Sequence, residues 1–126
     1  MIRIIVAFLR SVPHATGQNY VIGAPGAAGS FESSAGGVAE YRPANAWPVL
    51  FHTNHPLASR DFVPGYVPGR GETNTAARMR SLESRLGTRP AGSLLEAIQG
   101  ALRARDSEEH PVCRRFTGRT NNFTLG

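Results

Sequence analysis

The chain has 126 residues, which is enough for one domain and too few for two. Its 14 basic residues are all arginines and give a net charge of +5, but they are scattered from Arg3 to Arg119 without interleaved aromatic residues, so a nucleic-acid interface is not favoured. No apolar run reaches the roughly 20 residues of a membrane span, and the single cysteine, Cys113, excludes an internal disulfide, so the composition favours a cytoplasmic protein.

The first half of the chain has the pattern of a β-meander. Its opening apolar stretch, residues 2–9, fits either a strand or the last turns of a helix, and the pattern does not decide between them. The predicted strands are residues 18–22, 28–33 and 37–41. The predicted connections are residues 23–29, which contain Pro25, and residues 34–36. The apolar run at residues 49–53 predicts a buried central strand.

The second half of the chain changes to helical patterning. Thr73 is a candidate cap for a helix that Gly87 ends, and Ser93 with Glu96 forms a capping box for a second helix. We expect an α+β fold with a largely antiparallel sheet: strands, two helices, then strands again. The chain is interpreted as a single domain with a strand-rich part (1–53), a loop (54–72), a helical pair (73–105) and the start of further strands (112–126).

The densest polar cluster follows the predicted strand at residues 49–53. Alternation along a strand would place His52 and Asn54 on one face, and loops at the rim of a rigid scaffold commonly carry functional groups. The Asn54 amide is able to donate to a developing oxyanion, and His55 is able to act as an acid or base or to orient a neighbour. The alternative is a polar strand end whose side chains only fix the next turn.

Other chemistries have less support in the sequence. His52 with His55, and His110 with Cys113, are spaced three apart as in some zinc sites, but they fall on a strand end and on a linker broken by Pro111. There is no HExxH, GxSxG or P-loop motif. The sequence therefore predicts no metal and no cofactor.

Several segments, taken together and in order, carry a resemblance to a known family. They are PHATGQNYVIG (13–23), SFESSA (30–35), VAEY (38–41), HTNHPL (52–57), NTAAR (74–78) and VCRR (112–115). In this order and spacing the chain resembles the middle portion of the penicillin acyltransferase-like cysteine peptidases, which are related to the choloylglycine hydrolases. The HTNHP segment is the most specific of these matches.

The resemblance implies an αββα sandwich and hydrolysis or transfer at amide bonds, with a small-molecule amide or acyl-coenzyme A as substrate. The family nucleophile is a cysteine freed as a new N-terminus, whose own α-amine acts as the base. An asparagine at the position of Asn54 stabilises the oxyanion. An arginine matched to Arg78 assists the polar network, although Arg80 is only two residues away. His52 and His55 are the expected substrate-binding residues.

The sequence departs from the family pattern where the chemistry begins. It holds no Gly-Cys-Thr processing site, and Cys113 resembles the non-catalytic Cys-Arg segment of the family. We therefore expect a fragment that is inactive alone, with self-association or a partner that supplies the missing half. The alternatives are a non-catalytic binding module or one subunit of a split enzyme, and thirdly a small arginine-rich nucleic-acid-binding protein.

Overall fold

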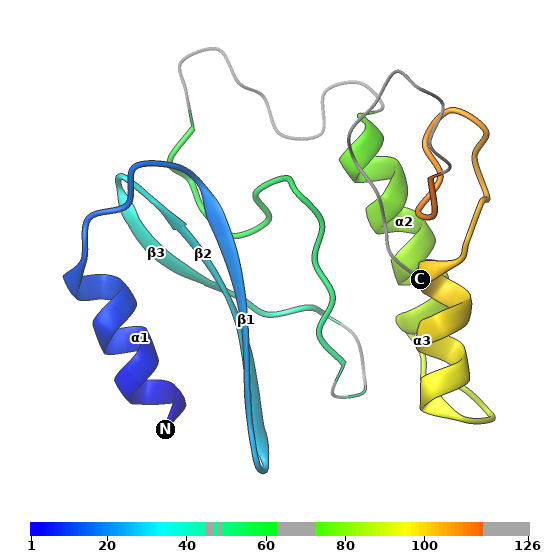
Figure 1. Cartoon of the computed structure of the whole chain (residues 1–126), viewed down its shortest axis with the longest axis horizontal. Coiled ribbons are helices and arrows are strands. Elements are labelled where there is room, and N and C mark those ends of the chain that lie inside the picture. The colour runs from blue at the N-terminus through cyan, green and yellow to red at the C-terminus, as the bar shows by residue number, and fades with distance from the viewer. Residues whose placement is uncertain (45–46, 48, 63–72, 115–126) are drawn as a thin grey trace. The chain divides into compact units, whose positions relative to one another are not determined.

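The structure, a computed structural model, describes residues 1–44, 47, 49–62 and 73–114. The chain divides into two units, one formed by Met1–Ala44 and Leu50–Pro68 and the other by Asn45–Val49 and Gly69–Gly126. The first unit contains a helix and a three-stranded antiparallel sheet, and the second contains two helices (Figure 1). The expected α+β class with an antiparallel sheet is confirmed, but the described order begins with a helix rather than a strand.

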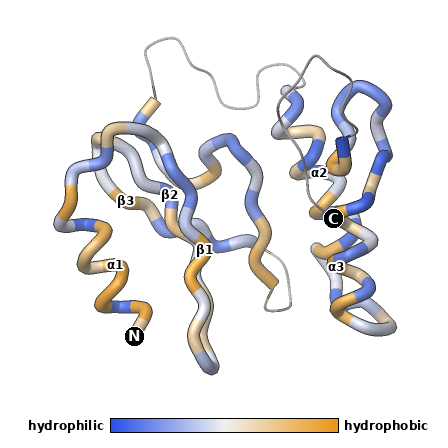
Figure 2. Tube along the Cα trace, viewed as in Figure 1, coloured by the Kyte–Doolittle hydropathy of each residue, from blue (hydrophilic) through white to orange (hydrophobic). Residues whose placement is uncertain are grey.

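The apolar stretch at the start of the chain forms helix α1 (Ile2–Ser11). The helix contacts all three strands of the sheet and buries Leu9 there. It ends at Val12, whose extended backbone suits a residue that precedes proline. The helix is hydrophobic along most of its length (Figure 2), and several of its large apolar side chains are exposed, including Ile4 and Phe8.

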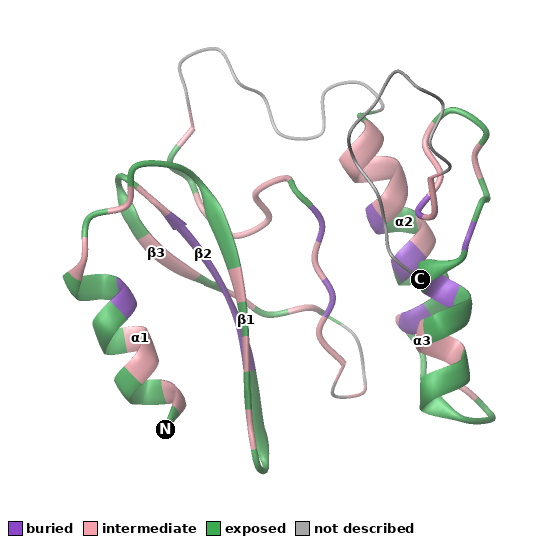
Figure 3. Ribbon diagram, in the orientation of Figure 1, coloured by how far each residue is buried: buried purple, intermediate pink, exposed green. Residues whose placement is uncertain are grey.

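The sheet has the order β1 (Gln18–Ala24), β2 (Ala27–Ser34), β3 (Gly37–Tyr41), as the sequence predicts to within two residues at each strand end. The β1–β2 turn contains Pro25, which presets the first turn position, and Gly26, whose φ of 74° suits the second. The central strand β2 is largely buried (Figure 3).

The two faces of the sheet have different neighbours. Asn19, Glu32 and Ala39 are directly opposite one another on the three strands and therefore share one face. Tyr20 and Phe31 are paired on the other face, where the ring of His14, just after α1, contacts Tyr20 at a centroid distance of 6.3 Å. Helix α1 thus covers one face, and Glu32 lies on the opposite face.

The predicted central strand at residues 49–53 is wrong, because residues 49–53 form no regular secondary structure. The amide of Val49, the first residue of this segment, donates to the Trp47 carbonyl at 2.8 Å. Burial of Phe51 accounts for the apolar character of the segment. The segment contacts the sheet through the side-chain hydrogen bond from His52 to Glu32 and not through backbone pairing with a strand. A buried apolar run does not by itself specify strand pairing.

The second unit is built on helices α2 (Asn74–Leu86) and α3 (Leu94–Leu102), which contact one another. Both predicted caps are confirmed, because Thr73 accepts from the Ala76 amide and Ser93 accepts from the Glu96 amide. Among the described residues of this unit, the buried apolar ones are Met79, Leu82, Leu86, Ala101, Ala104 and Val112.

The predicted strand at residues 112–116 is not formed where the structure describes it, at residues 112–114. The Cys113 amide donates to the Ala104 carbonyl at 3.0 Å, so the segment folds back on the residues that follow α3. Residues 115–116, the predicted strand at 121–126 and the loop residues 63–72 lie outside the described residues.

Candidate functional site

A cavity of about 560 Å³ lies in the first unit, between the sheet and the segment that follows it. This volume is within the range of small-molecule binding sites. Three of the sequence-predicted site residues line it together: His52, Asn54 and His55. His52 and Asn54 do not share one face of a strand, as predicted, because no strand forms there. The irregular segment nevertheless places both residues at one cavity.

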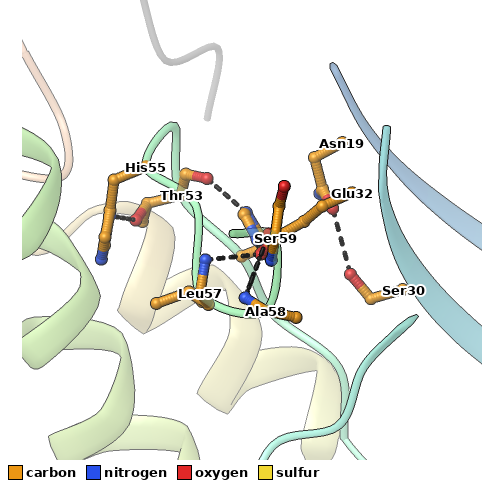
Figure 4. A network of polar contacts seen from close by, with 9 residues as sticks. Asn19, Ser30, Glu32, Thr53, His55, Leu57, Ala58 and Ser59 are labelled. Atoms are coloured by element: carbon orange, nitrogen blue, oxygen red, sulfur yellow. Dashed lines mark hydrogen bonds and ion pairs between the residues drawn. The ribbon is translucent and has the colours of Figure 1, made fainter. Parts of the chain in front are cut away.

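The wall of the cavity is organised around a carboxylate that the sequence reasoning missed. Glu32, in the middle of β2, is only 4 % exposed. Its Oε1 accepts from His52 Nε2 at 2.8 Å and from the Leu57 amide at 2.7 Å, and its Oε2 accepts from the Ser59 amide at 2.7 Å. The Ala58 amide lies 3.1 and 3.0 Å from the two oxygens (Figure 4). Three consecutive amides thus form a nest for the carboxylate.

These contacts decide the charge state of Glu32. Burial alone would raise the pKa of the Glu32 carboxyl, but the hydrogen bonds from His52 and from the three backbone amides outweigh it and leave the pKa below its ordinary value of 4.5. The carboxylate is therefore ionised at neutral pH, and its oxygens are occupied by protein donors. Glu32 is thus not arranged to act as an acid or a base.

The two histidines have different surroundings at the cavity. The side chain of His52 is 3 % exposed, its Nδ1 lies against the carbonyl of Thr53, and its ring meets Tyr41 edge-on at a centroid distance of 5.4 Å. His55 is half-buried, with Nδ1 3.0 Å from the hydroxyl of the buried Thr53. His52 is thus fixed by its contacts with Glu32, Thr53 and Tyr41, and His55 contacts the hydroxyl of Thr53 at the same wall.

Asn54 is exposed and lines the same cavity, between the two histidines in sequence. A second amide at the wall, Asn19, accepts a hydrogen bond of 3.1 Å from Ser30. Asp61 ties the far end of the segment to the sheet, since it accepts from the Gly36 amide at 2.7 Å. Hydrogen bonds from Ser34 and from the Gly36 amide lower the pKa of the Asp61 carboxyl.

The predicted site arginine, Arg78, belongs to α2 in the second unit. It is half-buried, and its Nε donates to Asn74 Oδ1, one helical turn earlier, at 3.0 Å. Burial and the nearby charge of Arg114 lower the pKa of Arg78. Arg80, on the same helix, is exposed, whereas Arg78 is half-buried.

One signal in the sequence points to Glu32. It is the only Asp, Glu, Lys or Arg between Arg10 and Glu40, and it falls in the centre of a predicted strand. A charged side chain at such a place requires partners when it is buried. Its partners are the ring of His52 and three backbone amides, 20 to 27 residues later in the chain, which no local pattern identifies.

Neither metal-like histidine pair forms a metal centre in the described part of the chain, where no three His, Cys, Asp or Glu side chains come together. Among the described helices, none has the length and apolar character needed to cross a membrane. Comparison with family models, curated proteins and solved structures found no match for this chain.

Proposed function

We propose that this chain carries the oxyanion-stabilising and acyl-binding part of an amide hydrolase or acyltransferase similar to the penicillin acyltransferase-like cysteine peptidases. Asn54 donates a hydrogen bond from its side-chain amide to the oxyanion of the tetrahedral intermediate. His52 and His55 line the pocket for a small-molecule amide or the acyl group of an acyl-coenzyme A.

The observation that carries this proposal is the position of Asn54 on a cavity of about 560 Å³. An oxyanion donor must be held at the edge of a substrate-sized pocket by a rigid support. The flanking residues supply that support, because His52 and the Leu57 amide are both bonded to the buried Glu32.

The arrangement of the first unit also supports an αββα sandwich as its parent architecture. In such a sandwich each sheet has helices on one face and the second sheet on the other. Here α1 covers one face of the β1–β3 sheet, and the opposite face carries Glu32 and the cavity. Under the proposal, the polar face is the one turned toward the second sheet.

The nucleophile of the proposed reaction comes from outside these 126 residues. Cys113 is the only cysteine in the sequence, and it belongs to the second unit, where its amide bonds to Ala104. A partner chain or a further segment then supplies a cysteine whose thiolate attacks the amide carbonyl. Arg78 belongs to the second unit, where its Nε donates to Asn74, and its expected role in the polar network of the family stays a prediction.

The first experiment measures release of the amine from a panel of N-acyl amino acids by the protein that combines this sequence with its nucleophile. Replacement of Asn54 by alanine should lower kcat by about a hundredfold or more with little change in KM, because the lost hydrogen bond forms mainly in the transition state. The control Gln99→Ala removes an exposed amide from α3 and should leave kcat unchanged. Near-normal kcat in the Asn54→Ala protein would refute the role of Asn54.

A non-catalytic binding module is the second candidate, and one observation favours it. No cysteine is among the described residues that line the cavity, so the pocket is able to bind an amide without cleaving it. Isothermal titration of the same N-acyl amino acids into the 126-residue chain, combined with product analysis, distinguishes the binding module from the enzyme. Saturable binding supports the binding module if no product forms, either with the chain alone or after each candidate partner chain is added.

A further inference from the structure

The contacts of Glu32 reach both sides of Asn54 along the chain. His52, two residues before Asn54, donates its Nε2 to Oε1 at 2.8 Å. Leu57 and Ser59, three and five residues after Asn54, donate their amides to the two carboxylate oxygens at 2.7 Å each. The four residues 53–56 are therefore held between two anchors that share one carboxylate.

The carboxylate itself has a rigid base. Glu32 lies near the middle of β2, the central strand, and is directly opposite Asn19 on one neighbouring strand and Ala39 on the other. Its side chain is buried, and hydrogen bonds are electrostatically stronger at a buried site than in water. Because β2 is paired with a strand on each side, the sheet fixes the position of Glu32 and therefore of the groups that bind its carboxylate.

We infer that Glu32 is the positioning residue of the site, which fixes residues 52–59 so that the Asn54 amide is presented to the cavity in one orientation. The catalytic part of this assignment rests on the proposed role of Asn54. That Glu32 holds residues 52–59 in place does not depend on that role. Glu32 touches no reacting atom in this account, because its oxygens are occupied by His52 and by the amides.

The role of Glu32 in holding residues 52–59 also explains why a charged side chain is buried at position 32. A nest of three amides binds an anion, and a neutral acceptor at position 32 cannot satisfy all of them. Glutamine has nearly the same shape as glutamate, but it has one carbonyl oxygen and an amide group that donates instead of accepting. Glu32→Gln therefore changes the contacts with little change in the packing of the sheet.

The first test uses amide hydrogen exchange in the 126-residue chain and needs no turnover. In Glu32→Gln the amides of Ala58 and Ser59 should exchange about tenfold faster or more, while the β1–β2 amides keep their rates. Glu40→Gln, on the neighbouring strand and exposed to solvent, is the matched control and should change neither set. Unchanged exchange at residues 57–59, or equal acceleration throughout the sheet, would overturn the assignment.

A second variant covers the case in which Glu32→Gln does not fold. Glu32→Asp keeps the charge but shortens the side chain by one methylene, so it reaches fewer of the donors. It should fold, accelerate exchange at residues 57–59 to a smaller extent, and leave the sheet amides unchanged. Wild-type exchange rates at residues 57–59 in this variant would also overturn the assignment.

The catalytic part is tested by a double-mutant cycle in the active protein. Glu32→Gln alone should lower kcat with KM nearly unchanged, and the double variant Glu32→Gln/Asn54→Ala should be no slower than Asn54→Ala alone. Fully additive losses would show that Glu32 does not act through Asn54. If Asn54→Ala itself has no effect on kcat, the proposed function fails, whereas the exchange result still decides the fixation of the segment.

Discussion

In the first unit the described buried residues include four polar ones, Ser30, Glu32, Ser33 and Thr53, whereas in the second unit all the described buried residues are apolar. The second unit buries the facing sides of α2 and α3, with Met79, Leu82 and Leu86 on the first of these helices. Burial of this kind is not directional, so it stabilises a fold without fixing the position of any one group closely.

The first unit depends on directional contacts instead. Its buried carboxylate requires each of several donors at hydrogen-bond distance, and a network of this kind specifies one arrangement of the segment around it. A site for chemistry needs that specification more than it needs stability. The difference places the candidate site in the unit with the buried polar network, and the following predictions test whether the two units really differ in this way.

The largest expected effect is in the core of the second unit. Leu82→Ala should lower the free energy of unfolding by about 2–5 kcal/mol, because it removes a buried side chain and leaves a cavity. The only tryptophan, Trp47, donates to the Leu86 carbonyl at 2.9 Å, so its fluorescence in urea reports on this unit. Leu95→Ala, at a site 63 % exposed, is the control, and an equal loss there would remove the distinction between core and surface.

The next effect concerns acid and the first unit. The folded pKa of Glu32 is below its ordinary value of 4.5, so its contribution is present above about pH 4.5 and is lost as the pH falls through the folded pKa. Glu32→Gln should lower the free energy of local opening of residues 57–59 at pH 7 by about 1.5–3 kcal/mol, as hydrogen bonds to a charged group contribute, and should make that opening less dependent on acid. The amide signals of residues 57–59 measured against pH test this, whereas simultaneous acid loss of the Trp47 signal in both proteins would contradict the separation of the units.

A smaller effect is expected at the β1–β2 turn. Gly26 has a φ of 74°, so Gly26→Ala should cost about 1–2 kcal/mol because a Cβ is unfavourable in that conformation. Gly23→Ala is the matched control: no atom lies within 4 Å of a Cβ added there, and Gly23 is not among the described residues with positive φ. Thermal unfolding followed by circular dichroism compares the two, and equal midpoints would show that the turn geometry is not required.

The smallest effect is expected at the cap of α3. Ser93→Ala removes the acceptor for the Glu96 amide and should cost about 1 kcal/mol, whereas Ser93→Asp retains an acceptor and should stay close to the wild type. The Trp47 fluorescence in urea again provides the measurement. A loss in Ser93→Asp as large as that in Ser93→Ala would mean that the hydroxyl has a different role.

The elements that the sequence predicts correctly are those with local signals. The Pro25–Gly26 turn and the caps Thr73 and Ser93 each act within four residues, and each is formed as expected. The opening stretch stays ambiguous in the sequence because it is apolar nearly throughout, whereas in the structure it is a helix that packs on the sheet. Local chemistry is therefore a good guide to turns and helix ends in this chain.

The sequence predicts the candidate site only in part, for a physical reason. It indicates the polar residues His52, Asn54 and His55 because they are clustered along the chain. The residue that orders them, Glu32, is 20 residues before His52, and most of its partners are backbone amides, which every residue has. The predicted strand at 49–53 failed for the same reason, since the segment is held by this distant side chain and not by strand pairing.

The most direct test of the central claim compares two ligands of the 126-residue chain by isothermal titration. One is an N-acyl amino acid, and the other is its phosphonamidate analogue, whose charged tetrahedral centre resembles the intermediate. We predict that Asn54→Ala weakens binding of the phosphonamidate about a hundredfold and leaves binding of the amide nearly unchanged, because an oxyanion donor acts on the developing charge. Equal losses for both ligands, or no loss for either, would contradict the assignment of this cavity to amide-bond chemistry.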